Sequence, residues 1–212
     1  MQPTVIGRLH TDDIQARLQS ICCKDIQFAV EFPDLQKYLT GSPRPAAVLI
    51  PFLMKEDGWH LLFTRRNPAL QEHSGQVAFP GGRMDPLDES PIDTALREAR
   101  EEIGLSPQDV QILGRLQDYL TITNYLVTPV VGVMPWPYPL RISPHEVSHV
   151  FTIPLEWLAD PQNHGIQHRS ISSRMAPVPV IYFQPYEGEV LWGASAKFTL
   201  GLLEALNHHS QT

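Results

Sequence analysis

Cysteine is scarce in this chain of 212 residues, and long apolar runs are missing from it. The two cysteines, Cys22 and Cys23, are neighbours. Because a disulfide between adjacent residues is strained, we interpret them as reduced thiols, which are typical of a reducing compartment. No apolar run approaches the roughly 20 residues that a membrane-spanning helix needs, and the first residues lack the pattern of a signal peptide. These absences favour a cytoplasmic protein without a membrane partner.

Positive charge is also in short supply. Lys and Arg number 16 against 23 Asp and Glu, which gives a formal net charge of -7. A general nucleic-acid-binding protein carries a basic patch, so nucleic acid is not expected as a partner. An anionic substrate would therefore have to be held by local arginines or by metal ions.

The order of apolar and turn-forming segments predicts an α/β fold. Strands are expected over residues 46–53, 59–66, 110–116, 125–134, 178–183 and 189–192, with a strand and a short helix over 146–158. Helices are expected over 11–23, 34–39, 91–103 and 194–209, and a turn over 41–45. Their imperfect alternation predicts a mixed sheet with helices on both faces. We divide the chain into an N-terminal helical extension, residues 1–40, and a main domain, residues 41–212.

Residues 91–103 carry strong helix signals. Ser90 is suited to cap the N-terminus, Pro91 to occupy the first helical position, and Gly104 to end the helix. The helical repeat places one apolar stripe toward the core. The members of this stripe are Ile92, Leu96, Ala99 and Ile103.

Three glutamates, Glu98, Glu101 and Glu102, lie within five residues of this helix. Glu98 and Glu102 are like charges one turn apart, and all three occupy the C-terminal half, where the helix dipole disfavours acids. A divalent cation such as Mg²⁺ or Mn²⁺ would compensate for this arrangement. The plain alternative is a solvated acidic face on which Arg97 pairs with Glu101.

A Gly-Gly turn precedes the acidic helix. Gly81 and Gly82 end a short strand, and without side chains their backbone permits a ligand or a metal to come close. The run "GGRMDPLDESPIDTALREAREEIGL", residues 81–105, resembles the Nudix box. The second half of the box matches at every fixed position from Arg97 to Leu105. In the first half, six residues instead of five separate Gly82 from Glu89, so the loop is one residue longer.

Two flanking segments resemble the coenzyme A pyrophosphatase branch of the Nudix hydrolases. They are "LLFTRRNPALQEHSGQVAFPGG", residues 61–82, and "VLWGASAKF", residues 190–198. The branch-like positions of the first segment and the box loop are Thr64, Arg66, Gly75, Gln76, Phe79, Pro80, Gly81, Gly82, Asp85 and Asp88. The chain departs from the branch at Asn67, where Ser or Ala is usual, and at Gln71, where Arg is usual.

The resemblance implies a Nudix fold, in which a mixed sheet lies between helices and the box forms a loop, a helix and a loop. It also implies Mg²⁺- or Mn²⁺-dependent hydrolysis of coenzyme A to 3',5'-ADP and 4'-phosphopantetheine. Gln71 keeps another nucleotide open as the substrate, such as ADP-ribose or a dinucleoside polyphosphate. A non-catalytic binding module is a third alternative, although such a protein should have lost the box acids.

Residue roles follow from the same resemblance. Glu98 and Glu102 are expected as the main metal ligands. Glu101 is expected as a further ligand or a water-positioning catalytic group, and the Gly82 carbonyl as an additional ligand. Arg97 is expected to orient the acids by pairing with Glu101 or with a loop acid such as Asp88.

A further catalytic acid is expected outside the box. Glu146 is the candidate, with an exposed strand-end glutamate as the alternative interpretation. Substrate contacts are assigned to Arg65, Arg66, Gly75, Gln76, Phe79, Gly81 and Arg83. Strand alternation lets only one of the two neighbouring arginines face the pocket, and the family pattern favours Arg66. The partner is then a small nucleotide, and a homodimer remains among the alternatives for assembly.

Overall fold

A computed structural model describes residues 9–21, 41–70, 74–170 and 177–207. Its main sheet is mixed, with strand order β3-β2-β1-β7-β5, and β4, β6 and β8 pair with β1, β7 and β2 respectively. The strands of this sheet are β1 (Arg44–Lys55), β2 (Gly58–Arg66), β3 (Val77–Ala78), β4 (Gly81–Arg83), β5 (Gln111–Arg115), β6 (Tyr119–Leu120), β7 (Tyr125–Val133) and β8 (Val147–Pro154). A separate hairpin is formed by β9 (His164–Arg169) and β10 (Val178–Phe183).

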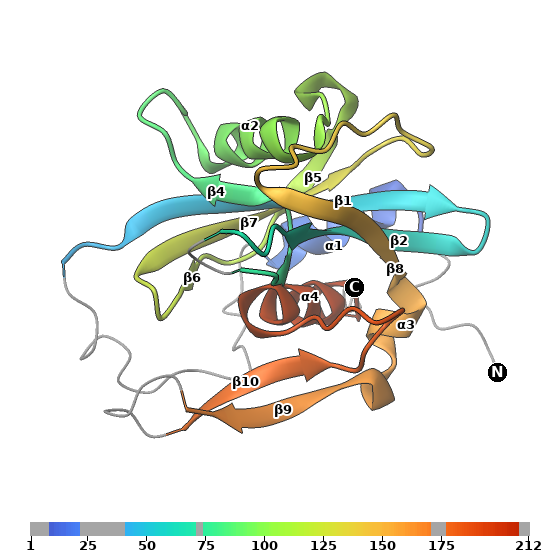
Figure 1. Cartoon of the computed structure of the whole chain (residues 1–212). Coiled ribbons are helices and arrows are strands. Elements are labelled where there is room, and N and C mark those ends of the chain that lie inside the picture. Colours follow the sequence, from blue (N-terminus) through green and yellow to red (C-terminus); the bar gives the residue numbers. More distant parts are fainter. Residues whose placement is uncertain (1–8, 22–40, 71–73, 171–176, 208–212) are drawn as a thin grey trace.

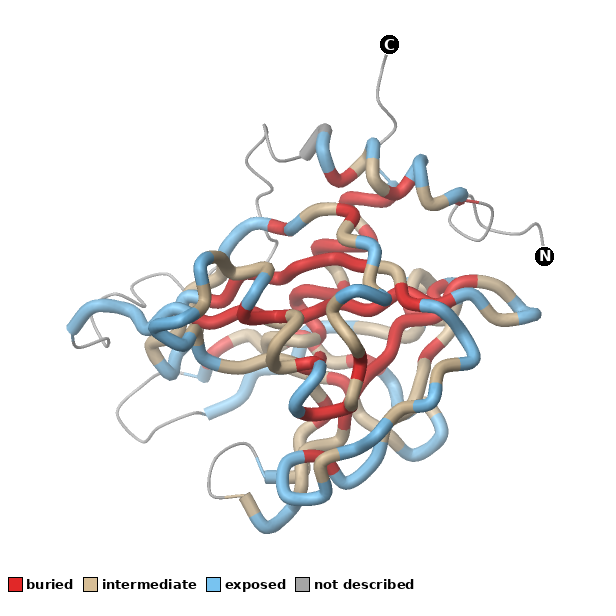
Figure 2. Tube along the Cα trace, turned by 90° about the horizontal axis from the view of Figure 1, so that it is seen from above, coloured by how far each residue is buried: buried red, intermediate tan, exposed pale blue. Residues whose placement is uncertain are grey.

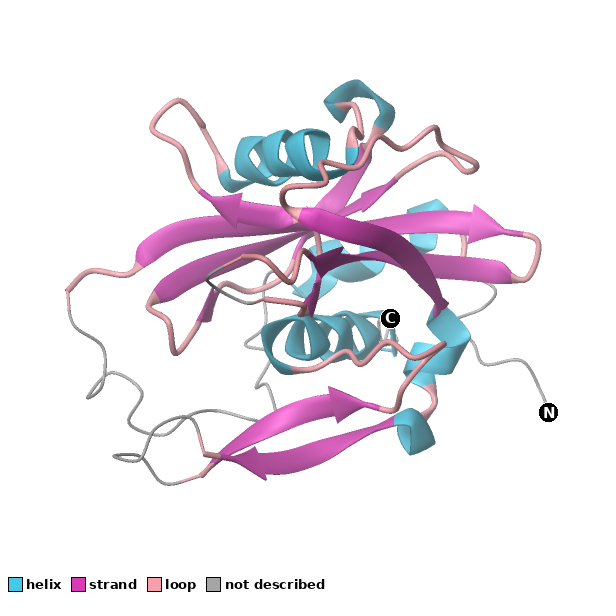
Figure 3. Cartoon of the chain, in the orientation of Figure 1, coloured by secondary structure: helices cyan, strands magenta, loops and turns pink. Residues whose placement is uncertain are grey.

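Helices cover both faces of the sheet (Figure 1). One face carries α2 (Pro91–Ile103), and the other carries α1 (Thr11–Ile21) and α4 (Gly193–Asn207). The hairpin lies beyond α4, and α3 (Leu155–Ala159) leads from β8 toward it, as the colouring of Figure 3 makes plain. Two short 3₁₀ turns, η3 (Pro107–Asp109) and η4 (Pro161–Asn163), complete the described elements. The predicted α/β fold is confirmed.

Strand β1 is the centre of the sheet because its sequence is apolar on both faces. It pairs in antiparallel fashion with β2 and β4 and in parallel with β7. Leu49 and Leu53 point to the cluster beneath α2, whereas Ile50 and Phe52 point to the cluster shared with α1 and α4. This alternation follows from the two-residue period of a strand. Buried residues accordingly follow the central strands in Figure 2.

The helix α1 shares the core of the main domain. Ile14 and Leu18 are buried in the same cluster as the α4 residues, as their helical spacing predicts. The indole Nε1 of Trp59 donates a hydrogen bond of 2.7 Å to the carbonyl of Leu9. The predicted boundary after residue 40 places α1 outside the main domain, although α1 contributes Ile14 and Leu18 to the core of that domain. The cysteine pair, the predicted helix 34–39 and Gln71 lie outside the described residues.

Two predictions about individual elements were wrong. Residues 189–192 form only isolated bridges, Tyr186 with Glu189 and Tyr182 with Trp192, because the chain turns sharply at Gly188, whose φ is 86°. The expected turn over 41–45 ends earlier than predicted, since Arg44 already belongs to β1. No helix in the described parts of the chain is long and apolar enough to cross a membrane.

Candidate functional site

The loop between β4 and α2 is held by its own acidic side chains. The Asp88 carboxylate accepts hydrogen bonds from the Asp85 amide at 2.8 Å and from the Thr94 hydroxyl at 2.9 Å. Ser90 caps α2 by accepting from the Asp93 amide, and Gly104 ends the helix with a φ of 71°. The signals read from the sequence therefore do set the two ends of this helix.

The buried face of α2 differs from the predicted stripe. Ala95, Ala99 and Ile103 are fully buried, and Glu102 is buried with them, whereas Leu96 is only partly covered. The reason is that α2 packs against β4 as well as β1. This contact turns the helix so that Glu102, at the border of the predicted stripe, faces the sheet.

Arg97 connects the loop between β4 and α2 to two glutamates of α2. Its guanidinium donates to both Asp88 oxygens, at 3.0 and 2.9 Å, and to the carbonyl of Arg83 at 2.9 Å. It also reaches Glu98 at 2.9 Å and Glu101 at 3.1 Å. The hydrogen bonds from Arg97 lower the pKa of Asp88 to about 2. Arg97 therefore makes both contacts that the sequence suggested for it, with the loop acid and with Glu101.

The three box glutamates differ strongly in exposure. The Glu102 side chain is 5% exposed, that of Glu98 18%, and that of Glu101 55%. Burial raises the pKa of Glu102 to about 8, partly opposed by the charge of Arg66, whose Nη1 lies 3.8 Å from Glu102 Oε1. Burial also raises the pKa of Glu98. Of the three glutamates, only Glu101 is as exposed as the alternative interpretation, a solvated acidic face, requires.

The glycine pair brings backbone against this carboxylate cluster. A Cβ added to Gly82 would lie 2.5 Å from the Glu98 carboxylate carbon, and one added to Gly81 would lie 2.6 Å from the Cα of Val48. A side chain at either position would force a neighbour to move, namely the Glu98 carboxylate at Gly82 and the β1 backbone at Gly81. Gly82 faces the acids, whereas Gly81 is pressed against β1.

The carboxylates of α2 include an oxygen that is free to bind a divalent cation. Glu102 Oε2 is buried without a hydrogen-bond partner, as is Arg66 Nε. Within the described residues, no three His, Cys, Asp or Glu side chains form a group that could hold a metal as they stand. Magnesium needs fewer, since it commonly takes one or two carboxylates together with water and substrate phosphates. Glu98 and Glu102, beside the Gly82 backbone, fit that requirement.

Glu146 lies near the acids despite its distance in sequence. Its charge raises the pKa values of both Glu98 and Glu102. Its segment is anchored to α2, because the Ser143 amide donates to the Glu102 carbonyl at 2.8 Å. Glu146 itself is exposed. Its side chain is therefore close enough to act on the same charges and open to solvent.

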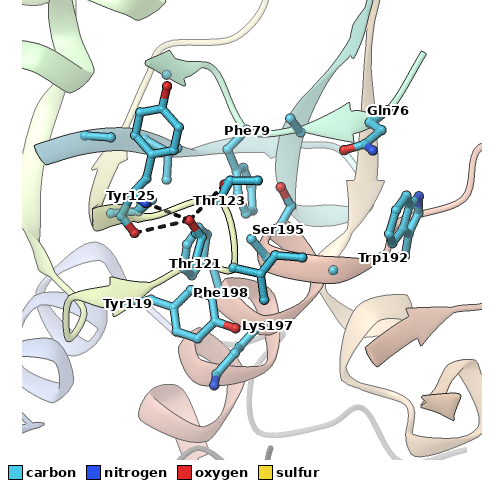
Figure 4. A pocket seen from close by; sticks show the side chains of 18 of the residues that line it. Gln76, Phe79, Tyr119, Thr121, Thr123, Tyr125, Trp192, Ser195, Lys197 and Phe198 are labelled. Carbon is cyan, nitrogen blue, oxygen red and sulfur yellow. Dashed lines mark hydrogen bonds between the residues drawn. The ribbon is translucent and has the colours of Figure 1, made fainter. Parts of the chain in front are cut away.

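A cavity of about 660 Å³ is lined in part by the glycine pair, of which Gly82 lies against the Glu98 carboxylate. Figure 4 shows other side chains that line it, among them Phe79, Tyr119 and Trp192. The cavity lies between the sheet, the start of α4 and the hairpin. The predicted substrate residues that line it are Arg66, Gln76, Phe79, Gly81 and Arg83. Phe79 is buried and stacks on Phe63 at a centroid distance of 4.6 Å, so it shapes the wall.

Two predicted substrate residues lie elsewhere. Arg65 points to the other side of β2, where it forms an ion pair of 2.7 Å with Glu189, and a Cβ on Gly75 would be 3.7 Å from Arg65. Neither residue is among those that line the cavity. Alternation along β2 separates Arg65 from Arg66, as the sequence suggested.

Several lining residues were missed by sequence reasoning. They include Tyr119 and Tyr125 near β7, Arg169 on the hairpin, and Trp192 and Lys197 near the start of α4. The segment 190–198, with its branch-like sequence, was the only available signal for the last two. Nothing in the sequence marked Arg169.

The family model described as "NUDIX domain" matches residues 43–179. A curated relative from Photorhabdus laumondii, named "Uncharacterized Nudix hydrolase NudL", is 41% identical over an aligned length of 178 residues, and the alignment covers 80% of this chain and 89% of that protein. A relative of the same name from Yersinia pestis is 40% identical, over 75% of this chain and 78% of its own. The chain therefore belongs to the Nudix hydrolase family.

Two solved structures are similar at lower identity. The Mycobacterium smegmatis Nudix hydrolase RenU is 21% identical with a TM-score of 0.48, over 57% of this chain and 76% of its own. A Caenorhabditis elegans Ap4A hydrolase is 19% identical with a TM-score of 0.45, over 53% of this chain and 81% of its own.

Proposed function

We propose that this Nudix hydrolase cleaves the diphosphate bond of coenzyme A or its derivatives in a reaction that depends on Mg²⁺ or Mn²⁺. The observation that carries the proposal is the junction of acid cluster and cavity. Arg66 lines the cavity, and its guanidinium lies 3.8 Å from the buried Glu102 carboxylate. A diphosphate lying along the glycine pair would meet cationic side chains on one side and metal-binding carboxylates on the other.

Glu98 and Glu102 are the side chains proposed to hold the cation, with the Gly82 carbonyl beside them. A bound divalent ion supplies polarisation of the phosphoryl oxygens and a water of lowered pKa. Arg97 keeps the Glu98 carboxylate in place through its 2.9 Å contact, while its bonds to Asp88 fix the guanidinium itself. Arg66 and Arg83, which line the cavity, are proposed to bind the phosphate oxygens from that side.

Glu101 and Glu146 are proposed to position or deprotonate the attacking water. Glu101 has an exposed carboxylate, one oxygen of which accepts a hydrogen bond of 3.1 Å from Arg97. Glu146 enters from a different segment and stays open to solvent. Both acids are close enough to Glu98 for their charges to raise its pKa, and both are exposed to solvent.

Coenzyme A is favoured as the substrate by the flanking signature. Gln76 and Phe79 belong to the branch-like segment and line the cavity, as do Trp192 and Lys197 from the second such segment. The two segments are far apart in sequence, yet residues of both surround one space. A volume of about 660 Å³ lies within the range of pockets that enclose a ligand of this kind.

A hydrolysis panel tests the proposal. Coenzyme A, an acyl derivative, dephospho-coenzyme A, ADP-ribose and diadenosine tetraphosphate would be incubated with enzyme and Mg²⁺ or Mn²⁺, and the products identified by mass. The proposal expects 3',5'-ADP and 4'-phosphopantetheine from coenzyme A at the highest kcat/KM. A higher kcat/KM for ADP-ribose or the dinucleoside polyphosphate would replace coenzyme A as the substrate, and no turnover of any compound would favour a binding module.

A further inference from the structure

The cavity differs in charge from the rest of the molecule. The chain has a formal net charge of -7, yet none of the residues that line the cavity in the described structure is Asp or Glu. Four of them are cationic, namely Arg66, Arg83, Arg169 and Lys197. Such segregation favours a ligand with more than one anionic group.

Two of these cations belong to the end of the cavity nearest the acids. Arg66 forms an ion pair with Glu102, and the carbonyl of Arg83 accepts a hydrogen bond from Arg97. Lys197 is buried within the domain, with its ammonium over the Tyr119 ring at 4.2 Å. Arg169 is different, because it lies on β9 of the hairpin.

The hairpin is well separated from the acids. In Figure 1, α2 lies above the sheet, whereas α4 and then the hairpin lie below it. Arg169 and the acid cluster on α2 therefore approach a ligand from opposite sides. A group bound by Arg169 would be remote from the bond that is cleaved.

Arg169 is held in position before any ligand arrives. Its guanidinium lies over the Trp192 ring at 4.4 Å, and its Nη1 donates a hydrogen bond of 3.1 Å to the Tyr182 hydroxyl. Tyr182 and Trp192 are themselves stacked, with an interplanar angle of 8°. A guanidinium fixed at one nitrogen still presents its other N–H groups to an anion, at a reduced entropic cost.

We infer that Arg169 is a specificity-determining residue, which binds a phosphomonoester on the substrate remote from the scissile diphosphate. Tyr182 and Trp192 act as positioning residues for it. The inference rests on the proposed function, in which coenzyme A carries such a group as its 3'-phosphate. The inference assigns the contact with the 3'-phosphate to Arg169 on the hairpin, whereas Arg66 binds the diphosphate.

The test compares substrates that differ only in the phosphomonoester. Steady-state kinetics with coenzyme A and dephospho-coenzyme A would be measured for wild type, Arg169→Ala, Arg169→Lys and Tyr182→Phe. Arg115→Ala is the matched control, since Arg115 is an exposed strand arginine that does not line the cavity. Thermal unfolding would establish that each variant is folded.

Arg169→Ala should lower kcat/KM for coenzyme A about tenfold to a hundredfold, the worth of a charge-assisted contact, and leave dephospho-coenzyme A nearly unchanged. The loss should fall on KM and not on kcat, because the contact persists from bound substrate to transition state. Arg169→Lys should restore part of the selectivity, and Tyr182→Phe should cause a smaller loss of the same kind. Equal losses for both substrates, or unchanged selectivity in Arg169→Ala, would overturn the inference.

A binding measurement separates this inference from the proposed function. Calorimetry would compare 3',5'-ADP, 2',5'-ADP and 5'-AMP, none of which contains the diphosphate. Tighter binding of either bisphosphate than of 5'-AMP, lost in Arg169→Ala, supports the inference even if coenzyme A is not hydrolysed, and the two bisphosphates distinguish the position of the phosphate. Equal binding of all three by wild type would contradict it even if coenzyme A is the substrate.

Discussion

Replacing Gly82 with alanine should damage activity while sparing the fold. The added Cβ would lie 2.5 Å from the carbon and one oxygen of the Glu98 carboxylate, against 3.4 Å or more for an ordinary contact. The difference, 3.4 − 2.5 = 0.9 Å, is the distance by which the carboxylate must retreat. Arg97 holds that carboxylate at 2.9 Å, so the movement also disturbs this ion pair.

A displacement of roughly 1 Å at a metal-binding carboxylate is expected to lower kcat about a hundredfold. The unfolding free energy should change by less than about 1 kcal/mol, because the obstructing atoms are the end of a flexible side chain. Turnover with saturating Mg²⁺ and urea-induced unfolding would measure the two effects. Wild-type turnover in Gly82→Ala would refute the view that the position of Glu98 matters.

Two other glycines, Gly81 beside Gly82 and Gly165 on the hairpin, provide matched controls. A Cβ on Gly81 would collide with the backbone of β1, at 2.6 Å from the Val48 Cα, so Gly81→Ala should cost about 1–3 kcal/mol of stability or more. A Cβ on Gly165 would meet nothing within 4 Å, so Gly165→Ala should alter neither activity nor stability. The same substitution is thus expected to give three different outcomes, each set by what the new methyl group meets.

Three further predictions concern charged side chains. Glu98→Gln and Glu102→Gln should each lower kcat by orders of magnitude in Mg²⁺ assays, because water activation needs the bound cation, and near-normal kcat would contradict the ligand assignment. In metal-free buffer above the Glu102 pKa of about 8, where both acids are charged, the unfolding free energy should be unchanged or higher, since one of two like charges is removed. Glu146→Gln should reduce kcat with little change in KM in the same assay, and an unaltered kcat would make Glu146 an exposed strand-end residue without a role. For Asp88→Asn, we expect a loss of about 1–2 kcal/mol in urea unfolding near pH 7, discounted for solvent screening. The pKa of Asp88 is lowered from 3.8 to about 2 in the folded chain, so its stabilisation is present above pH 3.8 and lost as the pH falls through 2, and a wild-type advantage that persists below pH 2 would disprove this account.

Much of the acidic helix could be predicted from local sequence. Ser90 and Gly104 bound α2 because capping depends on residues next to the helix end. The rotation of α2 could not be predicted, because contact with β4 and not helical periodicity decides which border residue is buried. Glu102 is therefore a deeply buried acid, whereas Leu96, with a larger apolar side chain, remains partly exposed.

Glu146 shows what can and what cannot be predicted from a single sequence. Its place after a loop made it a candidate, yet only the fold brings its charge close enough to affect Glu98 and Glu102. The strand expected at residues 189–192 shows the converse. The apolar residues of a strand are present in this segment, but a strand also needs a hydrogen-bonded partner along its length, and here the described chain forms only isolated bridges.

The sequence by itself determined the family, the acids of the box and the two ends of their helix, since motif spacing and capping are local properties. Only the tertiary structure decided how deeply each acid is buried, and that Arg169 lines the same cavity as Arg66. Those features depend on segments more than a hundred residues apart, such as Arg66 and Arg169, that meet around one space. Their proximity arises from packing against the shared sheet and α4, and no local pattern in the chain encodes that contact.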